Sequence, residues 1–312
     1  MSAEDLPSMV NRSSQRLNFL WLEITGRCQL NCEHCYADSG PMGTHGSMTI
    51  ERWKSVIDQA AALGVKAVQF IGGEPTLHPG LPTLIRHSLA KGMDVEVFSN
   101  LLRIPRSLWD EFSRSGIRLA TSYYSNDASQ HDEITGRTGS YVNTRNGIKE
   151  AILRGIPLRV GVIGVRKGQN VGRAVRELKS LGVSDIGIDY LREVGRGQRE
   201  QAQDMTQLCG QCASGVLAVG PDGTVWPCVF SRWLPVGSLA RQSLEEVAHG
   251  EDLRVTRKSL ANNFNSRLHD YDLNYCPPDC DPCRCGPLHC DPGRCQPFWR
   301  CVPRDCGPDS ST

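Results

Sequence analysis

The sequence predicts an α/β fold: a partial (β/α)6 barrel followed by a small cysteine-rich C-terminal domain. Apolar, strand-like segments alternate with segments of helical period up to residue 190, and the end of the chain is dominated by Cys, Pro and Gly. Alternating strands and helices imply right-handed crossovers and a parallel sheet. Six units are too few for a closed eight-stranded barrel, so we expect an open barrel with its chemistry at the carboxyl ends of the strands.

The first strand and helix show the pattern on which the other elements are assigned. FLWLEIT (19–25) is a continuous apolar run, typical of a buried strand. TIERWKSVIDQAAALG (49–64) carries apolar residues at helical spacing, with Thr49 as N-cap and Gly64 as C-cap. The remaining expected strands are 66–72, 94–100, 117–124, 157–164 and 184–190, and the remaining expected helices are 81–91, 105–115, 144–154 and 170–181.

The character of the sequence changes near residue 200. GVLAVGPDGTVWPC (215–228) predicts a hairpin around Pro-Asp-Gly, and a short helix fits 243–249. From residue 276 onward the chain has neither helical nor strand period. We therefore divide the chain into an N-terminal extension (1–16), the barrel (17–200), a hairpin-and-helix module (201–275) and a Cys-Pro-rich tail (276–312).

Composition and charge indicate the compartment and exclude some partners. The chain has 35 Lys and Arg against 34 Asp and Glu, which gives no reason to expect nucleic acid or an anionic membrane as partner. There is no apolar run of membrane-spanning length and no signal-peptide pattern at the N-terminus. We expect a soluble cytoplasmic protein, in which 14 cysteines indicate metal or redox chemistry rather than disulfides.

Three cysteines directly follow the first strand. GRCQLNCEHCY places Cys28, Cys32 and Cys35 at C-x3-C-x2-C spacing. Three thiolates on a short loop suit a cluster of four irons with one iron left open for a ligand. The alternative is a zinc site with a fourth ligand such as His34 or His45.

The second strand ends in IGGEP (71–75), a second candidate binding element. Gly72 and Gly73 permit close approach of the backbone to a ligand. Glu74 adds a carboxylate that can receive an ammonium group.

With Tyr36 after the last cysteine and GGEP at the next strand end, the sequence resembles the radical S-adenosylmethionine (SAM) superfamily over roughly residues 17–200. The resemblance implies a [4Fe-4S] cluster on the three cysteines, SAM chelated to the open iron, and the GGEP stretch holding the methionine amino group. Reduction would cleave SAM to a 5′-deoxyadenosyl radical that takes a hydrogen atom from the substrate. The cofactor-binding residues it implies are Tyr36, Gly72, Gly73, Glu74, Pro75, Ser99, Asn100, Ser122, Val162 and Arg192.

Several of these positions have a purely structural alternative. Asn100 fits a turn cap, Val162 a core position and Arg192 a surface ion pair. HDEITGRTGSYVNT (131–144) resembles the loop after the fourth strand in family members that modify peptides. SYYS (122–125) stands where that subgroup usually has Ser-Leu-Asp-Gly.

A second cysteine group begins the C-terminal module. The frame C-x10-G-x4-C from Cys212 to Cys228 resembles the opening of SPASM and twitch extensions, which bind one or two auxiliary [4Fe-4S] clusters. Either Cys209 or Cys212 is the first ligand. The tail, with its repeated C-x-P pattern, departs from the usual SPASM spacing. We expect it to supply further cluster ligands, and the alternative interpretation is a partly oxidised segment that binds no cluster. The further ligand candidates are Cys276, Cys280 and Cys283.

Three functions remain open from sequence. The first is maturation of a ribosomally synthesised peptide by cross-linking, epimerisation or oxidation. It would use a flavodoxin or ferredoxin as reductase and a separate peptide-recognition protein, because few residues precede the first strand. The second is an epimerase or dehydrogenase acting on a sugar or other small metabolite. The third is a non-catalytic zinc or iron–sulfur binding protein.

Overall fold

One continuous nine-stranded sheet organises the molecule, whose computed structural model describes residues 16–200 and 203–270. The strand order is β6-β5-β4-β3-β2-β1-β7-β8-β9, and neighbours from β6 through β1 to β7 are parallel. β6 and β9 are the two edges, so the barrel is open, as predicted. The barrel strands are β1 (Phe19–Thr25), β2 (Ala67–Gly72), β3 (Asp94–Phe98), β4 (Ile117–Tyr123), β5 (Leu158–Gly164) and β6 (Asp185–Tyr190).

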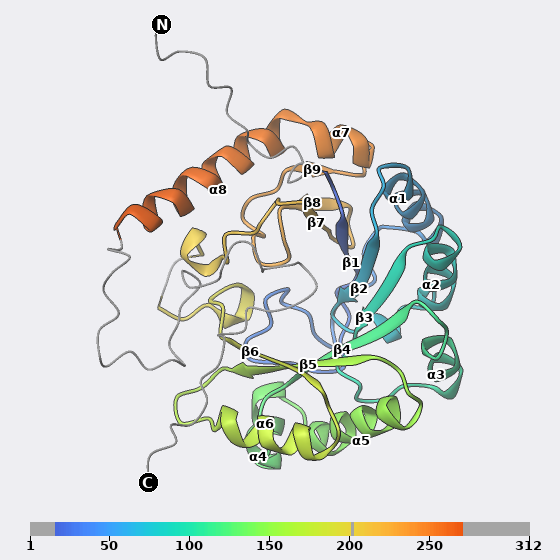
Figure 1. Ribbon diagram of the computed structural model, residues 1–312, viewed down its shortest axis with the longest axis vertical. Coiled ribbons are helices and arrows are strands. Elements are labelled where there is room, and N and C mark those ends of the chain that lie inside the picture. The colour runs from blue at the N-terminus through green and yellow to red at the C-terminus, as the bar shows by residue number, and fades with distance from the viewer. Residues whose placement is uncertain (1–15, 201–202, 271–312) are drawn as a thin grey trace, which may run out of the picture.

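Helices follow the barrel strands and lie on the outer face of the curved sheet (Figure 1). Alternate residues of β1, such as Leu20 and Leu22, belong to the same core as Trp53 and Ile57 of the first helix. The opposite face carries Phe19 and Trp21, which pack in edge-to-face contact. Both faces are covered, which explains the continuous apolar run. The helices are α1 (Ile50–Ala62), α2 (Leu81–Ala90), α3 (Arg106–Phe112), α4 (Ala128–Thr135), α5 (Ser140–Leu153) and α6 (Val171–Ser180), with a short 3-10 turn η2 (Pro75–Leu77).

The segment 131–144, predicted to be a loop, is mostly helical, so that prediction is wrong. α4 begins after Asp127, whose side chain accepts a hydrogen bond from the Gln130 amide, and it ends at Gly136 in the left-handed conformation. Asp132 then accepts hydrogen bonds from the amides of Gly139 and Tyr141, which lie at the start of α5. The N-cap and glycine signals for α4 are present in the sequence, but its apolar stripe is weak.

The C-terminal module continues the barrel sheet. β7 (Val216–Val219) pairs in parallel with β1, and the predicted hairpin to β8 (Thr224–Trp226) turns at Gly223, whose φ is +85°. Within the described residues, the two cysteine-bearing parts, 28–35 and 209–228, are therefore anchored to the same strand, β1. A 3-10 turn, η3 (Gly195–Gly197), follows β6 at the end of the barrel. The module is completed by a second 3-10 turn, η4 (Met205–Gln207), by β9 (Gly237–Ser238), and by helices α7 (Leu244–His249) and α8 (Glu251–Asp270). The long helix α8 was not expected from the sequence.

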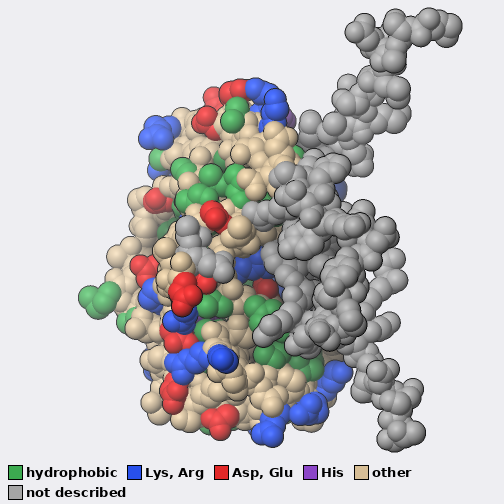
Figure 2. All heavy atoms as spheres, turned by 90° about the vertical axis from the view of Figure 1, so that its left-hand side faces the viewer, with side chains coloured by type: hydrophobic (Ala, Val, Ile, Leu, Met, Phe, Trp, Pro, Cys, Tyr) green, Lys and Arg blue, Asp and Glu red, His purple; other side chains and the backbone are tan. Residues whose placement is uncertain are grey.

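The surface of the described chain agrees with its near-zero net charge. On the face shown in Figure 2, basic and acidic side chains are interspersed. No helix within residues 16–200 and 203–270 combines the length and apolarity needed to cross a lipid bilayer.

A buried ion pair ties the module to the barrel. Glu23 of β1 is 1% exposed, and its carboxylate accepts hydrogen bonds of 2.7 and 2.9 Å from Arg232. The Arg232 guanidinium also lies 4.4 Å from the centre of the Trp226 ring. Burial raises the pKa of the Glu23 carboxyl even though Arg232 acts to lower it. The pair therefore depends on both partners being present.

We predict that Arg232→Ala lowers the free energy of unfolding by about 3–5 kcal/mol, because it leaves the Glu23 carboxylate buried without a partner. Arg254→Ala is the control, since Arg254 and its partner Glu251 are largely exposed, and it should change stability little. Urea unfolding of the two variants measures the difference. Equal losses would show that the Glu23 pair does not contribute as described.

Candidate active site

A cavity of about 430 Å³ lies where the carboxyl ends of the barrel strands meet the cysteine loop, residues 28–35. Its wall combines that loop, the ends of β2 to β6, the segment after β6, and Phe230 from the C-terminal module. This is the position at which a barrel of parallel strands carries its chemistry. Of the predicted site residues it brings together Cys28, Cys32, Cys35, Tyr36, Gly72, Gly73, Asn100, Ser122 and Arg192.

Four predicted cofactor contacts do not line the cavity. Phe98 and Asn100 face it, so Ser99 between them points away. Gly161 and Ile163 face it, and Val162 is instead fully buried in the helix-side core. Ser99 and Val162 thus lie outside the cavity lining, and their contact with the cofactor stays a prediction. The other two are Glu74 and Pro75.

The Glu74 carboxylate stabilises the turn after β2. It accepts hydrogen bonds from the amide and hydroxyl of Thr76 (3.1 and 2.7 Å), from the Ser99 hydroxyl (2.8 Å) and from the Asn100 amide (2.8 Å). Burial raises the pKa of this carboxyl, and these donors act against that rise. With its oxygens so engaged, the side chain is not placed to receive an ammonium group. It binds the GGEP turn to the end of β3.

The glycine backbone, by contrast, reaches the cavity. The Gly73 amide donates to the Thr25 carbonyl at 2.7 Å, and the Glu74 amide donates to the Arg27 carbonyl at 2.8 Å. A Cβ atom at Gly73 would lie 2.3 Å from the Arg27 carbonyl oxygen, so no larger residue fits. The GGEP turn therefore packs directly on the start of the cysteine loop.

The C-terminus of α4 holds the other side of the cysteine loop. The amides of Asn31 and Glu33 donate to the carbonyls of Thr135 and Ile134, at 3.0 and 3.1 Å. Carbonyls in the last turn of a helix have no partner within the helix, so α4 offers acceptors to a loop that lacks regular structure. A Cβ atom at Gly136 would lie 2.7 Å from the Asn31 carbonyl oxygen. The helix that sequence reasoning missed is therefore a main support of the loop.

In the cysteine loop Cys28 is buried, whereas Cys32 and Cys35 are partly exposed. Burial raises the pKa of the Cys28 thiol to about 12 and also raises that of Cys32, so iron must displace protons when it binds. The Leu30 amide lies 3.4 Å from the Cys28 sulfur and Asn100 Nδ2 lies 3.7 Å from it. The Ser39 amide donates to the Cys35 sulfur at 3.3 Å. Hydrogen bonds to sulfur of this kind tune iron–sulfur clusters.

The two histidines considered as zinc ligands make other contacts. His34 Nε2 lies 3.2 Å from the Tyr124 hydroxyl, and His45 Nδ1 lies 2.9 Å from the Thr25 hydroxyl. Within the described ranges, no three His, Cys, Asp or Glu side chains converge closely enough to hold a single metal ion. A four-iron cluster is wider than one ion, and its thiolates stand further apart.

Two buried ring nitrogens in the cavity wall fit a bound ligand. Burial lowers the pKa of His34 and of His131 to about 4, so both rings are neutral near pH 7. Among the described residues, His34 Nδ1 and His131 Nε2 have no hydrogen-bond partner. Buried polar atoms are normally satisfied. The sequence had placed Tyr124 only within SYYS (122–125) at the end of the fourth strand, and His131 only within the 131–144 segment.

The second cysteine group is also gathered. The sulfur atoms of Cys212 and Cys228 are 3.0 Å apart and both residues are buried. Hydrogen bonding with Cys212 lowers the pKa of the Cys209 thiol to about 6 despite burial, so the Cys209 thiol lies next to that of Cys212. Cys276, Cys280 and Cys283 lie outside the described residues.

Aromatic contacts connect this group with the cavity. The ring of Phe230, two residues after Cys228, packs edge-to-face against Tyr36 with centroids 5.2 Å apart. Arg192 lies over the same Phe230 ring at 5.4 Å and donates to the Gln207 carbonyl at 2.9 Å. The predicted cavity residues Tyr36 and Arg192 therefore contact the module that carries the second group.

Comparison with known sequence families agrees with this geometry. The profile of the Radical SAM superfamily matches residues 22–188, more than half of the chain. The chain belongs to the radical SAM superfamily. An iron–sulfur cluster-binding (SPASM) domain profile matches residues 209–284. The predicted fold and cofactors are confirmed: this is an enzyme that uses a [4Fe-4S] cluster with SAM, and its SPASM domain binds auxiliary iron–sulfur clusters. The alternative of a non-catalytic binding protein is set aside.

The proteins to which this chain is similar carry names that refer to different kinds of product or ligand. The subtilosin biosynthesis protein AlbA of Bacillus subtilis is 24% identical over 260 residues, 72% of this chain and 58% of AlbA. An AdoMet-dependent heme synthase of Methanosarcina barkeri is 26% identical over 177 residues, 56% of this chain and 51% of the synthase. The chain thus spans between half and three-fifths of these relatives. The crystal structure of Streptococcus suis SuiB bound to precursor peptide SuiA shares the fold, with TM-score 0.66 and 13% identity over 88% of this chain and 70% of SuiB.

We predict that Gly136→Ala destabilises the protein more than Gly155→Ala does. Both glycines have similar positive φ values, 64° and 66°, so alanine should cost about 1–2 kcal/mol of backbone strain at either site. At Gly155 no atom lies within 4 Å of the new Cβ, whereas at Gly136 it meets the Asn31 carbonyl. Denaturant unfolding of the metal-free variants measures how much more Gly136→Ala lowers the free energy of unfolding than Gly155→Ala does. If the two variants are equally stable, α4 does not hold the cysteine loop as described.

Proposed function

We propose that this radical SAM enzyme matures a ribosomally synthesised peptide, by cross-linking, epimerisation or oxidation. The observation that carries the proposal is the cavity shared between the barrel and the SPASM module, whose wall includes Tyr36 and the Phe230 ring that packs against it. The relatives named for bacteriocin biosynthesis and the fold shared with a precursor-peptide complex support a peptide as substrate.

The side chains around the cavity have separate roles in this proposal. Cys28, Cys32 and Cys35 hold the SAM cluster, and the backbone of Gly72 and Gly73 receives the methionine amino group. When bound, the cluster and SAM supply a 5′-deoxyadenosyl radical that removes a hydrogen atom from the substrate. The protein's share is to orient the reactants and to keep water away from them. Asn100 contributes by donating to the Cys28 sulfur.

The SPASM module holds at least one auxiliary cluster in this proposal. Cys209, Cys212 and Cys228 supply thiolates from the described part of the chain, and the tail candidates Cys276, Cys280 and Cys283 complete the ligand set. A flavodoxin or ferredoxin supplies electrons, a separate protein recognises the peptide, and the enzyme acts in the cytoplasm. The reduced state that so many thiols require supports this compartment.

A small metabolite is the second candidate substrate. The heme synthase relative favours it, and a cavity of about 430 Å³ lies within the usual range of small-molecule sites. Genes adjacent to the coding sequence discriminate the two. A short precursor-peptide gene supports the first substrate class, and glycosyltransferase genes support the second.

We predict that changing Cys28, Cys32 or Cys35 to Ala abolishes formation of 5′-deoxyadenosine. Each change removes one ligand of a cluster that needs all three. The assay is anaerobic reconstitution followed by dithionite and SAM, with nucleoside products quantified by chromatography. Product formation by any of the three variants at the wild-type rate contradicts the proposed ligation.

The matched experiment replaces Cys209, Cys212 and Cys228 together by Ala. We expect this variant to lose iron and sulfide but to keep part of the SAM cleavage, because the barrel site is left intact. Iron and sulfide analysis of the reconstituted proteins measures the loss. Unchanged iron content rules out an auxiliary cluster at these three thiols.

A further inference from the structure

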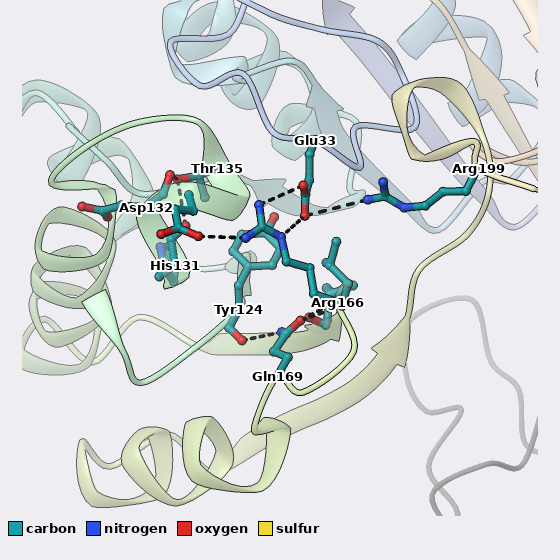
Figure 3. A network of polar contacts seen from close by, with 11 residues as sticks. Glu33, Tyr124, His131, Asp132, Thr135, Arg166, Gln169 and Arg199 are labelled. Carbon is teal, nitrogen blue, oxygen red and sulfur yellow. Dashed lines mark hydrogen bonds and ion pairs between the residues drawn. The ribbon is translucent and has the colours of Figure 1, made fainter. Parts of the chain in front are cut away.

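One arginine, Arg166, joins the cysteine loop to the loop after β5 and to α4 (Figure 3). Arg166 lies in the loop after β5, and its guanidinium donates to both carboxylate oxygens of Glu33, at 2.7 and 3.0 Å. Glu33 directly follows Cys32 in the sequence. A third N–H of the same guanidinium donates to Glu133 of α4 at 2.9 Å. Arg166 therefore bridges the cysteine loop and the helix that supports it.

The position of Arg166 is itself fixed by Gln169. The Gln169 side-chain oxygen accepts hydrogen bonds from the amides of Val165 and Arg166, at 2.7 and 3.1 Å. Its side-chain nitrogen donates to the carbonyls of Tyr124 and Ile163, at 2.5 and 2.6 Å. These carbonyls lie at the ends of β4 and β5. The guanidinium is thus held relative to two barrel strands.

The ion pair of Arg166 with Glu33 contributes little to the free energy of unfolding, and its effect is on the local geometry of the cysteine loop. The Arg166 side chain is 35% exposed and Glu33 is 27% exposed, so solvent screens the pair. Two-point Arg–carboxylate contacts nevertheless fix geometry closely. The arginine also places a positive charge against a carboxylate adjacent to a proposed cluster ligand. Charge and geometry around the ligands set the reduction potential of an iron–sulfur cluster.

We propose that Arg166 is a positioning residue for the SAM cluster: it clamps the cysteine loop against α4 through Glu33 and offsets the Glu33 charge beside the cluster. The inference rests on the proposed ligation by Cys28, Cys32 and Cys35. It concerns residues that do not themselves bind iron. A failure of the ligation would appear in the cysteine variants, which do not change Arg166.

The test compares Arg166→Gln, Glu33→Gln and the double variant in the reconstituted full-length protein. The reduction midpoint of the SAM cluster is measured by redox titration, with electron paramagnetic resonance as the readout. The signal of the SAM cluster is recognised because adding SAM changes it. We expect R166Q to shift the midpoint potential to more negative values, because Glu33 then keeps only its longer ion pair with Arg199 (3.9 Å) next to a cluster that gains an electron. E33Q should shift it to more positive values, and the double variant should return toward the wild type.

We also expect R166Q and the double variant to form 5′-deoxyadenosine about 10- to 100-fold more slowly, as for other outer-sphere partners of metal ligands. Arg173→Gln is the control, since it removes an exposed cation of α6 without touching the clamp, and it should change neither quantity. If R166Q fails to take up iron, E33Q still reports the charge effect. Wild-type potentials and cleavage rates in both single variants would overturn the proposal.

Discussion

The site depends on one backbone interaction: the amides of the cysteine loop pair with the last carbonyls of α4. The loop has no helix or strand of its own, so its polar backbone groups must find partners elsewhere. The GGEP turn meets it from the β2 side, through the amides of Gly73 and Glu74. Three segments distant in sequence thereby define where the thiols lie, and the cavity forms between them.

A single sheet carries both cysteine groups. Because β7 pairs with β1, the SPASM module extends the barrel sheet at the strand that leads into the cysteine loop. The pair of Glu23 and Arg232 and the ring contact of Tyr36 with Phe230 add side-chain links across the same region. The two cysteine groups are therefore held in a fixed spatial relation, and the cavity is lined by the first group and by Val229 and Phe230, which follow Cys228.

Much of this could be predicted from the sequence, for physical reasons. Strand-like segments alternating with segments of helical period identified the six barrel strands, and the spacing of Cys28, Cys32 and Cys35 directly after the first of them located the site. Side chains along a strand alternate between the cavity side and the helix side. The exact strand ends were not known from the sequence, so it did not say which set of side chains faces the cavity. Ser99 and Val162, which were predicted to contact the cofactor, do not line the cavity. The Glu74 carboxylate follows the second strand as expected, but it accepts hydrogen bonds from Thr76 of its own turn and from Ser99 and Asn100 at the end of β3. α4 was missed because its apolar stripe is weak, although Asp127 and Gly136 mark its ends.

The central claim, that SAM binds the open iron of a cluster held by Cys28, Cys32 and Cys35, is tested most directly by nuclear hyperfine spectroscopy. The reduced protein would be frozen with SAM carrying 15N in its amino group, and electron–nuclear double resonance would be recorded on the cluster signal. We expect a hyperfine coupling to that nitrogen, which shows direct coordination to iron. A cluster spectrum unchanged by SAM, with no nitrogen coupling, would contradict the claim.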